Sequence, residues 1–341
     1  MDNEKTKVSV LIPCRNEAKY IESFVQNIYN FESPDGGFEV IVIDGMSDDG
    51  TRDTLHRLKE QYSDLVIVDN PKKTVPHAMN LGIQLARGEY IIRTDVRCIH
   101  PKSYLNDLVK LSERTGADNV GGVLVPIIGA AYIEKSIALA YKSPIAMGGA
   151  LRERSNFVGE TDTVYGGCFK RERLLEAGMY DEEMVRNQDD ELSFRLRKTG
   201  GKIIQDSNIK VRYYPRKYYK HVFKQFMQYG YWKVAVIKKH PQQASVRHFL
   251  PALLVLGFVA FIIVALFCRY ALYGLFLYSL SYFLPVSLES FRLAYKADIK
   301  LWPGVITAIS LIHIGFGIGF ILHIVCRLFN IKPTFFEALS R

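Results

Sequence analysis

Three acidic side chains stand together in the run VRNQDDELSFRLRKTGG (185–201), and two kinds of chemistry could explain them. Asp189, Asp190 and Glu191 open a stretch with helical periodicity, where acids interact favourably with the helix dipole. Glu191 also lies four residues before Arg195, a spacing that allows an ion pair on one helix face. A carboxylate can instead act as a general base that removes a proton from an attacking hydroxyl group. The spacing leaves both interpretations open for Asp189.

Other polar residues that could bind a ligand follow short apolar runs of the kind that form strands. Pro13 ends the run KVSVLIP, and Arg15 and Glu17 follow it. Asp44 ends the run FEVIVID, and Asp49 follows it, while Asp95 ends the run YIIRTD. The carboxyl ends of parallel strands meet at one edge of a sheet, so these turns predict a single pocket. Carboxylates there can accept hydrogen bonds from a base and a ribose, or hold a divalent cation against a diphosphate. A nucleotide-sugar site fits this chemistry, although a helix cap explains the acids of DGMSDDGT equally well.

The elements that must position these residues alternate between strand and helix patterns. Strands are predicted at Lys7–Pro13, Phe38–Asp44, Tyr90–Asp95 and Asn119–Val125, and helices at Ala18–Asn30, Thr51–Tyr62 and His77–Arg87. Such alternation with near-continuous apolar strands predicts an α/β fold with a Rossmann-like, mostly parallel sheet. No GxGxxG follows the first strand and no GxxxxGKS/T occurs, so neither glycine-rich phosphate loop identifies the ligand.

The last third of the chain contains three long apolar stretches, at Phe249–Phe267, Ala271–Leu288 and Leu301–Cys326. Each approaches the roughly 17–25 residues that cross a bilayer as a helix, so a region of about three transmembrane helices is predicted. Eleven Lys and Arg residues and no Asp or Glu lie between positions 207 and 288, which exceeds the net charge of +9 of the whole chain. Basic residues before the first span place that side in the cytoplasm, but three crossings would then put Arg327 and Lys332 outside, against the same rule.

This composition predicts three regions along the chain. A cytosolic domain is expected at residues 1–206, a basic and aromatic juxtamembrane segment at 207–248, and a multi-pass region in the cytoplasmic (inner) membrane at 249–341. The N-terminus has no apolar signal region, so the first domain is expected to stay in the cytosol. The five cysteines lack paired metal spacing, so neither a zinc site nor a disulfide framework is expected.

Five segments, taken in order, resemble the family 2 glycosyltransferases, which have the GT-A fold. They are VSVLIPCRNE, IVIDGMSDDGT, PHAMNLGIQLARGEYIIRTD, VYGGCFKRERLLEAGMYDE and NQDDELSFRLRKTGGK, and they cover roughly residues 7–205. The run TDTVYGGCFKRE, followed later by YYPR, QYGYW and a hydrophobic tail, is most similar to membrane-bound transferases of succinoglycan-type exopolysaccharide synthesis. The resemblance implies that residues 1–206 form a GT-A nucleotide-sugar transferase domain.

The resemblance also implies roles for the residues of the predicted pocket. Pro13, Arg15 and Glu17 would lie beside the nucleotide, Asp44 would read a uracil-type base, and Asp49 would lie near the ribose or base. Asp95 occupies the first position of the family's DxD motif and would bind the nucleotide together with Mg²⁺ or Mn²⁺. Arg97 stands where the second acid of that motif belongs. A cation held by Asp95 and phosphate oxygens is the favoured interpretation, and a share for Arg97 in neutralising the diphosphate stays open.

For catalysis, Asp189 matches the second position of the family's ED motif, with Gln188 in place of Glu, and is assigned as the base. Further residues are assigned to the acceptor or the diphosphate: Gly166, Gly167, Gln228, Trp232 and Lys233. The glycine pair could equally be a tight turn. In QYGYW, which is similar to the QxxRW motif of processive synthases, Tyr231 replaces Arg, and Lys233 is the residue that could compensate. The same aromatic and basic segment also fits a helix at the membrane surface.

The sequence therefore predicts an inverting, membrane-bound hexosyltransferase. Its expected partners are a nucleotide-sugar donor, which the resemblance implies to be a UDP-sugar, a polyprenyl-diphosphate-linked saccharide acceptor, membrane lipids and other glycan-assembly enzymes, but no nucleic acid. A polyprenyl-phosphate sugar synthase and a processive polysaccharide synthase are the enzymatic alternatives. A nucleotide-binding membrane scaffold without activity is the alternative outside enzymes.

Overall fold

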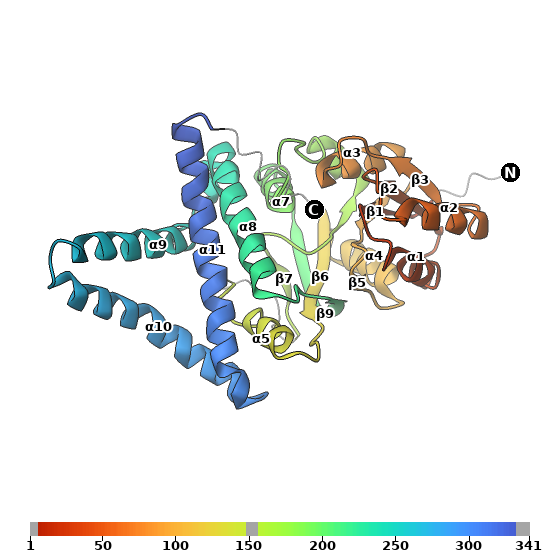
Figure 1. Ribbon diagram of the computed structural model, residues 1–341. Coiled ribbons are helices and arrows are strands. Elements are labelled where there is room, and N and C mark those ends of the chain that lie inside the picture. The colour runs from red at the N-terminus through yellow and green to blue at the C-terminus, as the bar shows by residue number, and fades with distance from the viewer. Residues whose placement is uncertain (1–5, 148–155, 332–341) are drawn as a thin grey trace. The chain divides into compact units, whose positions relative to one another are not determined.

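The computed structural model describes residues 6–147 and 156–331 (Figure 1). Within these residues the chain forms two compact units. The first contains residues 6–125 and 156–213, and the second contains residues 126–147 and 214–331. A segment from the middle of the sequence, residues 126–147, thus belongs to the same unit as the apolar C-terminal helices.

The first unit is built on one mixed sheet. Its strands are β1 Val8–Cys14, β2 Phe38–Asp44, β3 Val66–Asp69, β4 Tyr90–Arg93, β5 Cys98–Ile99, β6 Asn119–Pro126, β7 Val158–Glu160, β8 Cys168–Lys170 and β9 Ile203–Tyr213. The strand order is β3-β2-β1-β4-β8-β6-β9-β5, and β7 pairs with β9. The half from β3 to β4 is parallel, whereas β8 pairs antiparallel with both β4 and β6. The predicted α/β fold is confirmed, with its parallel strands gathered in the N-terminal half.

Helices cover both faces of this sheet because its strands are apolar on both sides. The helices are α1 Ile21–Tyr29, α2 Thr51–Gln61, α3 Val75–Leu85, α4 Tyr104–Thr115, α6 Arg171–Glu176 and α7 Gln188–Lys198. Along β1, Val10 and Ile12 pack with α1, α2 and α4, while Leu11 between them packs with α3, α6 and α7. This alternation follows the period of two of a strand, and it leaves the strand ends free to carry polar residues.

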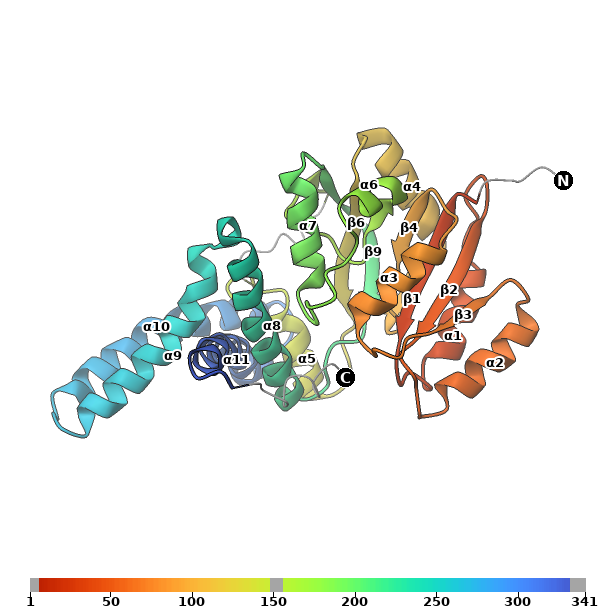
Figure 2. The ribbon, with the colours of Figure 1, turned by 90° about the horizontal axis from the view of Figure 1, so that it is seen from above.

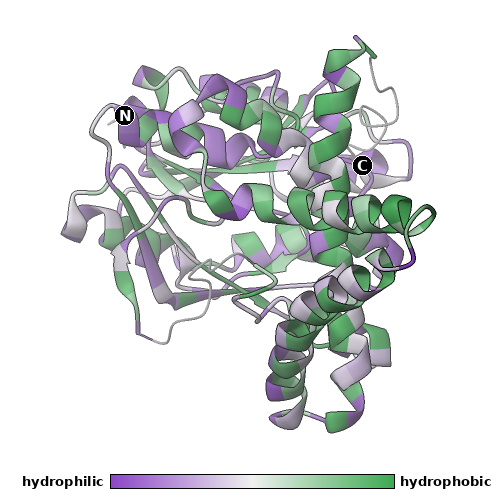
Figure 3. Ribbon diagram, turned by 90° about the vertical axis from the view of Figure 1, so that its left-hand side faces the viewer, coloured by the Kyte–Doolittle hydropathy of each residue, from purple (hydrophilic) through white to green (hydrophobic). Residues whose placement is uncertain are grey.

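The second unit consists of helices. They are α5 Tyr132–Ala140, α8 Tyr219–Lys239, α9 Val246–Ala265, α10 Ala271–Tyr295 and α11 Trp302–Leu328, with short 3₁₀ turns η1 Pro241–Gln243 and η2 Ile299–Leu301. Three helical segments, Val246–Ala265, Ala271–Tyr295 and Ile299–Leu328, are long and apolar enough to cross a membrane. Figure 3, which looks at the protein from the side of the α9 and α10 hairpin, shows long hydrophobic helical stretches. The predicted C-terminal membrane region is confirmed in this sense.

Candidate active site

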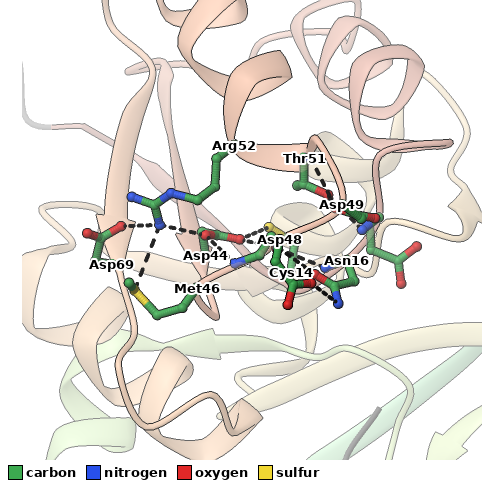
Figure 4. A network of polar contacts seen from close by, with 11 residues as sticks. Cys14, Asn16, Asp44, Met46, Asp48, Asp49, Thr51, Arg52 and Asp69 are labelled. Carbon is green, nitrogen blue, oxygen red and sulfur yellow. Dashed lines mark hydrogen bonds and ion pairs between the residues drawn. The ribbon is translucent and has the colours of Figure 1, made fainter.

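The turn after β2 is organised around the Asp44 carboxylate, of which only 1% is exposed. Its oxygens accept hydrogen bonds from the Ser47 hydroxyl group at 2.5 Å and from the Ser47 backbone N–H at 3.0 Å. The Arg52 guanidinium group lies between Asp44 and Asp69, 2.9 Å from the first and 2.8 Å from the second (Figure 4). An open cavity of about 620 Å³ lies beside Asp44, Arg52 and β3. Asp44 and Arg52 therefore both line this cavity, and 33% of the Arg52 side chain is exposed.

The turns after β1 and β2 hold each other in place. The backbone N–H of Asn16, a residue with φ of 56°, donates to the Ser47 hydroxyl oxygen at 2.8 Å, and that of Glu17 donates to the Thr51 hydroxyl oxygen at 2.8 Å. Asp49 accepts from the Thr51 hydroxyl group at 2.5 Å and from the Ala18 backbone N–H at 3.2 Å. Burial by itself would raise the pKa of Asp49, but these hydrogen bonds hold that pKa below its ordinary value. The contacts of Asp49 are those of a turn that begins a helix, next to the predicted nucleotide site.

Pro13 and Arg15 lie where β1 passes into this pair of turns. Pro13 is opposite Ile43 in the parallel register of β1 and β2. The Arg15 side chain packs against Gly45, where an added Cβ would come 3.1 Å from the Arg15 Cβ. The Arg15 Nε is buried without a hydrogen-bond partner among the described residues. A buried donor of this kind suits an acceptor supplied by a ligand.

Arg97, the residue that departs from the DxD pattern, is bound to Glu17. Its Nε lies 3.0 Å from each carboxylate oxygen of Glu17, and its guanidinium group lies 5.7 Å from the centre of the Tyr20 ring. The pair joins the turn after β1 to the turn after β4. Glu17, predicted to lie beside the nucleotide, is thus paired with Arg97, and 46% of the Arg97 side chain stays exposed.

Arg93, the last residue of β4, connects Asp189, the predicted base, with Asp95, the predicted metal ligand. Its Nη1 donates to both oxygens of Asp189, at 2.8 and 3.0 Å, and its Nη2 and Nε donate to Asp95 Oδ1 at 3.1 and 3.3 Å. Only 9% of the Arg93 side chain is exposed, against 39% for Asp189 and 34% for Asp95. The structure thereby brings Asp95 and Asp189 to one buried cation, although 94 positions separate them in the chain. Arg93 was not among the predicted site residues, because its position within the run YIIRTD indicates only a strand.

The pKa values within this triad follow from burial and from the one positive charge. Burial raises the pKa of Asp189 above its ordinary value, and Arg93 opposes that rise. Burial alone would lower the pKa of Arg93, but Asp189 and Asp95 raise it well above its ordinary value, so the guanidinium group stays charged. A carboxylate with a raised pKa that is still held in a fixed orientation is suited to accept a proton.

The Gly166 and Gly167 pair lies against the backbone of Arg93. Both residues have positive φ, of 66° and 81°, and the Arg93 backbone N–H donates to the Gly167 carbonyl oxygen at 3.3 Å. A Cβ on Gly166 would come 2.8 Å from the Arg93 carbonyl oxygen. Positive φ and close approach together require glycine here. These contacts support the end of β4, so the pair positions Arg93 whether or not an acceptor also reaches it.

Two of the three adjacent acids of α7, Asp189 and Glu191, have different surroundings. Asp189 reaches Arg93, while Glu191, with 2% of its side chain exposed, receives two hydrogen bonds from Arg195, at 2.7 and 2.8 Å. The predicted pairing of Glu191 with Arg195 is confirmed. Arg195 also donates to the backbone carbonyl oxygens of Ala177 and Met179, so this pair anchors α7 to the chain after α6.

Asn80 provides a second anchor for the approach to α7, and sequence reasoning did not single it out. Its side-chain amide donates to the Tyr180 carbonyl oxygen and accepts from the Tyr180 backbone N–H, both at 2.9 Å. The Asn80 amide also donates to Glu182 at 3.0 Å, and His77 lies 3.1 Å from the same carboxyl group. These bonds tie the chain before α7 to α3.

The predicted acceptor residues of QYGYW lie on α8 in the second unit. Gln228 and Lys233 are buried, with exposures of 6% and 9%, and Trp232 packs in a small apolar cluster with Met227 and Tyr231. These residues lie on a helix of the second unit, whereas the other predicted site residues belong to the first unit.

Comparisons with known proteins identify the family. The model described as "Glycosyl transferase family 2" matches residues 9–172. The succinoglycan biosynthesis protein ExoA of Rhizobium meliloti (strain 1021) is 32% identical over 249 residues, which cover 72% of this chain and 74% of that protein. The chain belongs to glycosyl transferase family 2. It is accordingly a glycosyltransferase, as the sequence predicted.

Two more distant proteins are similar to this transferase over much of its length. A dolichyl N-acetyl-alpha-D-glucosaminyl phosphate 3-beta-D-2,3-diacetamido-2,3-dideoxy-beta-D-glucuronosyltransferase of Methanococcus voltae is 28% identical over 68% of this chain and 74% of that protein. A solved structure of a mannosyltransferase from Pyrobaculum calidifontis, in complex with GDP-Man and Mn²⁺, has a TM-score of 0.60 at 20% identity, covering 96% of this chain and 88% of that one. The structural likeness confirms the predicted GT-A fold.

Asp95 is the predicted metal ligand of this transferase. Among the described residues there is no group of three His, Cys, Asp or Glu side chains that could hold a metal ion. Asp95 is placed at a strand end with a third of its side chain exposed, and one of its oxygens bonds to Arg93. Mg²⁺ commonly binds to one or two carboxylates together with substrate phosphates and water. The donor set therefore fits a cation that arrives with a diphosphate, and it does not fit a preformed metal cage.

Proposed function

We propose that this transferase moves a sugar from a nucleotide sugar, with UDP as the expected nucleotide, to a saccharide carried on a polyprenyl diphosphate, with inversion at the anomeric carbon. The observation that carries the proposal is the pairing of Asp189 and Asp95 through Arg93 at the end of the parallel half of the sheet. The names of the relatives support a lipid-linked saccharide as acceptor, since one is a succinoglycan biosynthesis protein and another is a glucuronosyltransferase named for a dolichyl N-acetyl-alpha-D-glucosaminyl phosphate.

In this mechanism Asp189 acts on the acceptor. As the acceptor hydroxyl oxygen bonds to the anomeric carbon, an Asp189 oxygen takes the hydroxyl proton. The bond from the anomeric carbon to the diphosphate breaks on the opposite face, and its electron pair leaves with the nucleoside diphosphate. Arg93 keeps the Asp189 carboxylate oriented, and burial keeps its pKa above the ordinary value, which strengthens it as a base.

The leaving diphosphate requires positive charge, and the chain has basic residues near the predicted nucleotide site. Arg97 is exposed and already orders the two turns that would flank the diphosphate. Asp95, together with phosphate oxygens, would hold Mg²⁺ or Mn²⁺, and such a cation when bound neutralises charge on the diphosphate. The complex of the Pyrobaculum mannosyltransferase with GDP-Man and Mn²⁺ supports a divalent cation in this fold.

We place the catalytic unit on the cytosolic side of the cytoplasmic membrane. The basic residues between positions 207 and 288, most of them before the first apolar helix, support this orientation. They also support binding to anionic lipid headgroups and to the diphosphate of a lipid-linked acceptor.

The test compares two neighbouring carboxylates. Purified full-length protein is incubated with a panel of nucleotide sugars and lipid-linked saccharides, and the linkage of the product is identified. Asp189→Asn should lower turnover by about 10²–10⁴-fold, the usual contribution of a general base, whereas Asp190→Asn should leave turnover near that of the parent. Transfer by Asp189→Asn at the parent rate would contradict the mechanism.

Two further arms separate the alternatives. Treatment with EDTA should abolish transfer, and Mg²⁺ or Mn²⁺ should restore it; activity that survives EDTA removes the cation from the proposal. Polyprenyl phosphate offered alone should not be an acceptor. Its use at the rate of the saccharide would favour a polyprenyl-phosphate sugar synthase, since a phosphate oxygen needs little help from a base.

A further inference from the structure

The structure separates the basic residues between positions 207 and 288 by their surroundings. Lys210 and Arg212 lie on β9 in the first unit, whereas Lys233 on α8 has only 9% of its surface exposed. Lys238 lies in the last turn of α8. Five basic side chains gather at the other end of that helix, which we call the α8 basic face: Arg216, Lys217, Lys220, His221 and Lys224.

The α8 basic face lies on the exposed side of its helix. Phe226 is buried with residues of α5 and α11, while Lys220, His221 and Lys224 are exposed. Residues four apart share one side of a helix, so Lys220 and Lys224 are neighbours. The pKa of His221 lies below its ordinary value, first because of partial burial. The positive charges of Lys220, Arg216 and Lys224 lower this pKa further, so the cations of the face are close enough to act on one another.

Few acids balance the charge of the α8 basic face. The sequence contains no Asp or Glu between positions 207 and 288. In the described part of the chain, Lys217 pairs with Glu134 of α5 at 3.9 Å, and no ion pair joins Arg216 or the other two lysines of the face to an acid. Like charges four residues apart destabilise a helix, and the positive end of the helix dipole lies here as well. The face therefore concentrates positive charge that an anionic partner would stabilise.

The surroundings of the face indicate what kind of anion it binds. In Figures 1 and 2, α8 lies beside α11, and both belong to the unit that contains three helical segments long and apolar enough to cross a membrane. Tyr218, which is 55% exposed, adjoins the face, and its ring lies 5.5 Å from that of His221. Aromatic and basic side chains occur together where a helix lies at the level of lipid headgroups. An anionic lipid surface therefore fits both the charge and the setting of this face.

We propose that the α8 basic face binds the phosphate groups of anionic lipids at the membrane surface. The inference rests on the membrane location in the proposed function, and it names the residues that make the contact. Each Lys or Arg near an anionic surface contributes roughly fivefold to binding, so several together hold the start of α8 at the headgroups. The surface potential also attracts protons, and at about −30 mV it raises the pKa of a histidine there by about half a pH unit.

The first test uses His221 of the full-length protein as a reporter. Protein with isotope-labelled histidine is placed in nanodiscs of phosphatidylcholine, alone or mixed equally with phosphatidylglycerol, and the NMR signal of His221 is assigned by its loss in His221→Gln. The pKa of His221 should be higher with phosphatidylglycerol by about half a pH unit. His56, exposed on α2 in the first unit, is the internal control, and its titration should not depend on the lipid. An unchanged titration of His221, or an equal change at both histidines, would overturn the proposal.

The second test removes charge from the face without changing a packed side chain. The variant carries Lys220→Gln and Lys224→Gln. Its matched control carries Lys110→Gln and Arg114→Gln on α4, two exposed cations with the same spacing in the first unit. Native mass spectrometry measures how much phosphatidylglycerol, relative to phosphatidylcholine, stays bound through purification in detergent. Retention by the α8 variant should fall by about tenfold or more, since each lysine contributes roughly fivefold, and the α4 variant should match the parent. Equal retention by the α8 variant and the parent would contradict the inference.

The third test separates a lipid from a free phosphate ion. Inorganic phosphate is added to the protein in phosphatidylcholine nanodiscs, with chloride at the same ionic strength as the reference, and His221 is titrated again. No change is expected, because no membrane holds the soluble ion at the face. A rise in the pKa of His221 as large as that with phosphatidylglycerol would assign the face to free phosphate and overturn the lipid assignment. None of these measurements uses a sugar, so their outcome and the outcome of the transfer assay are independent.

Discussion

Replacing Arg93 with Gln removes the one cation that Asp189 and Asp95 share. The variant loses two hydrogen bonds to Asp189 and two to Asp95, all between charged groups. Hydrogen bonds to charged groups contribute about 1.5–3 kcal/mol when they are shielded from water. The side chains of Asp95 and Asp189 are 34% and 39% exposed, so solvent screens part of their interaction with Arg93. We therefore expect Arg93→Gln to lower the free energy of unfolding by about 1–3 kcal/mol.

The more specific expectation concerns pH. Arg93 opposes the rise that burial causes in the pKa of Asp189, so this pKa should rise further in Arg93→Gln. A base acts only when deprotonated, and the acidic limb of the rate profile should move to higher pH. A carboxyl group whose pKa is higher in the folded than in the unfolded protein loses its stabilising contribution as pH rises through the folded value. The destabilisation of Arg93→Gln should consequently be larger at pH 7.5 than at pH 5.

The assay measures kcat and kcat/KM for sugar transfer from pH 5 to 9, with thermal unfolding at both ends. Misplacement of the base should reduce kcat by up to about 100-fold at the optimum, and Arg93→Lys should recover part of the loss. Arg87→Gln is the matched control, because Arg87 pairs with Glu39 at 2.9 Å away from the proposed base. A uniform loss of rate in Arg93→Gln with an unmoved acidic limb would refute the proposed coupling between Arg93 and Asp189.

Three further predictions concern stability. Glu191→Gln should lower the free energy of unfolding by about 2–4 kcal/mol, because it breaks the buried pair with Arg195. Turnover per folded molecule should change little. An unchanged melting temperature would contradict this prediction. Burial lowers the pKa of His100 to about 4, so the unfolded protein binds a proton at a higher pH than the folded protein does. Acidification from pH 6.5 to 4 should therefore lower the free energy of unfolding by up to about 3 kcal/mol. His100→Phe should remove this pH dependence in thermal melts across that range. Gly319→Leu should cost about 1–3 kcal/mol in detergent melts, since even a Cβ there meets the Met227 carbonyl oxygen; a stability equal to the parent's would show that α8 and α11 can separate freely.

Local patterns were sufficient to predict the parallel half of the fold. The runs at 7–13 and 38–44 are apolar on both faces, and such runs form the buried strands β1 and β2 because helices must cover each side. The polar turns after these strands could be placed at one edge of the sheet, because the carboxyl ends of parallel strands meet there. The contacts of Ser47 with Asp44 and Asn16 could not be predicted, because they depend on how the two turns meet in space.

The sequence by itself determined the strand and helix alternation, the apolar C-terminal helices and the residue types of the candidate site, since these follow from periodicity and chemistry within short segments. Only the tertiary structure decided that Arg93 joins Asp95 to Asp189, because β4 and α7 come from distant parts of the chain. It likewise decided that protein covers a larger share of α11 than of α9 and α10. Hydropathy measures how poorly a helix interacts with water, and it cannot tell whether lipid or protein replaces that water.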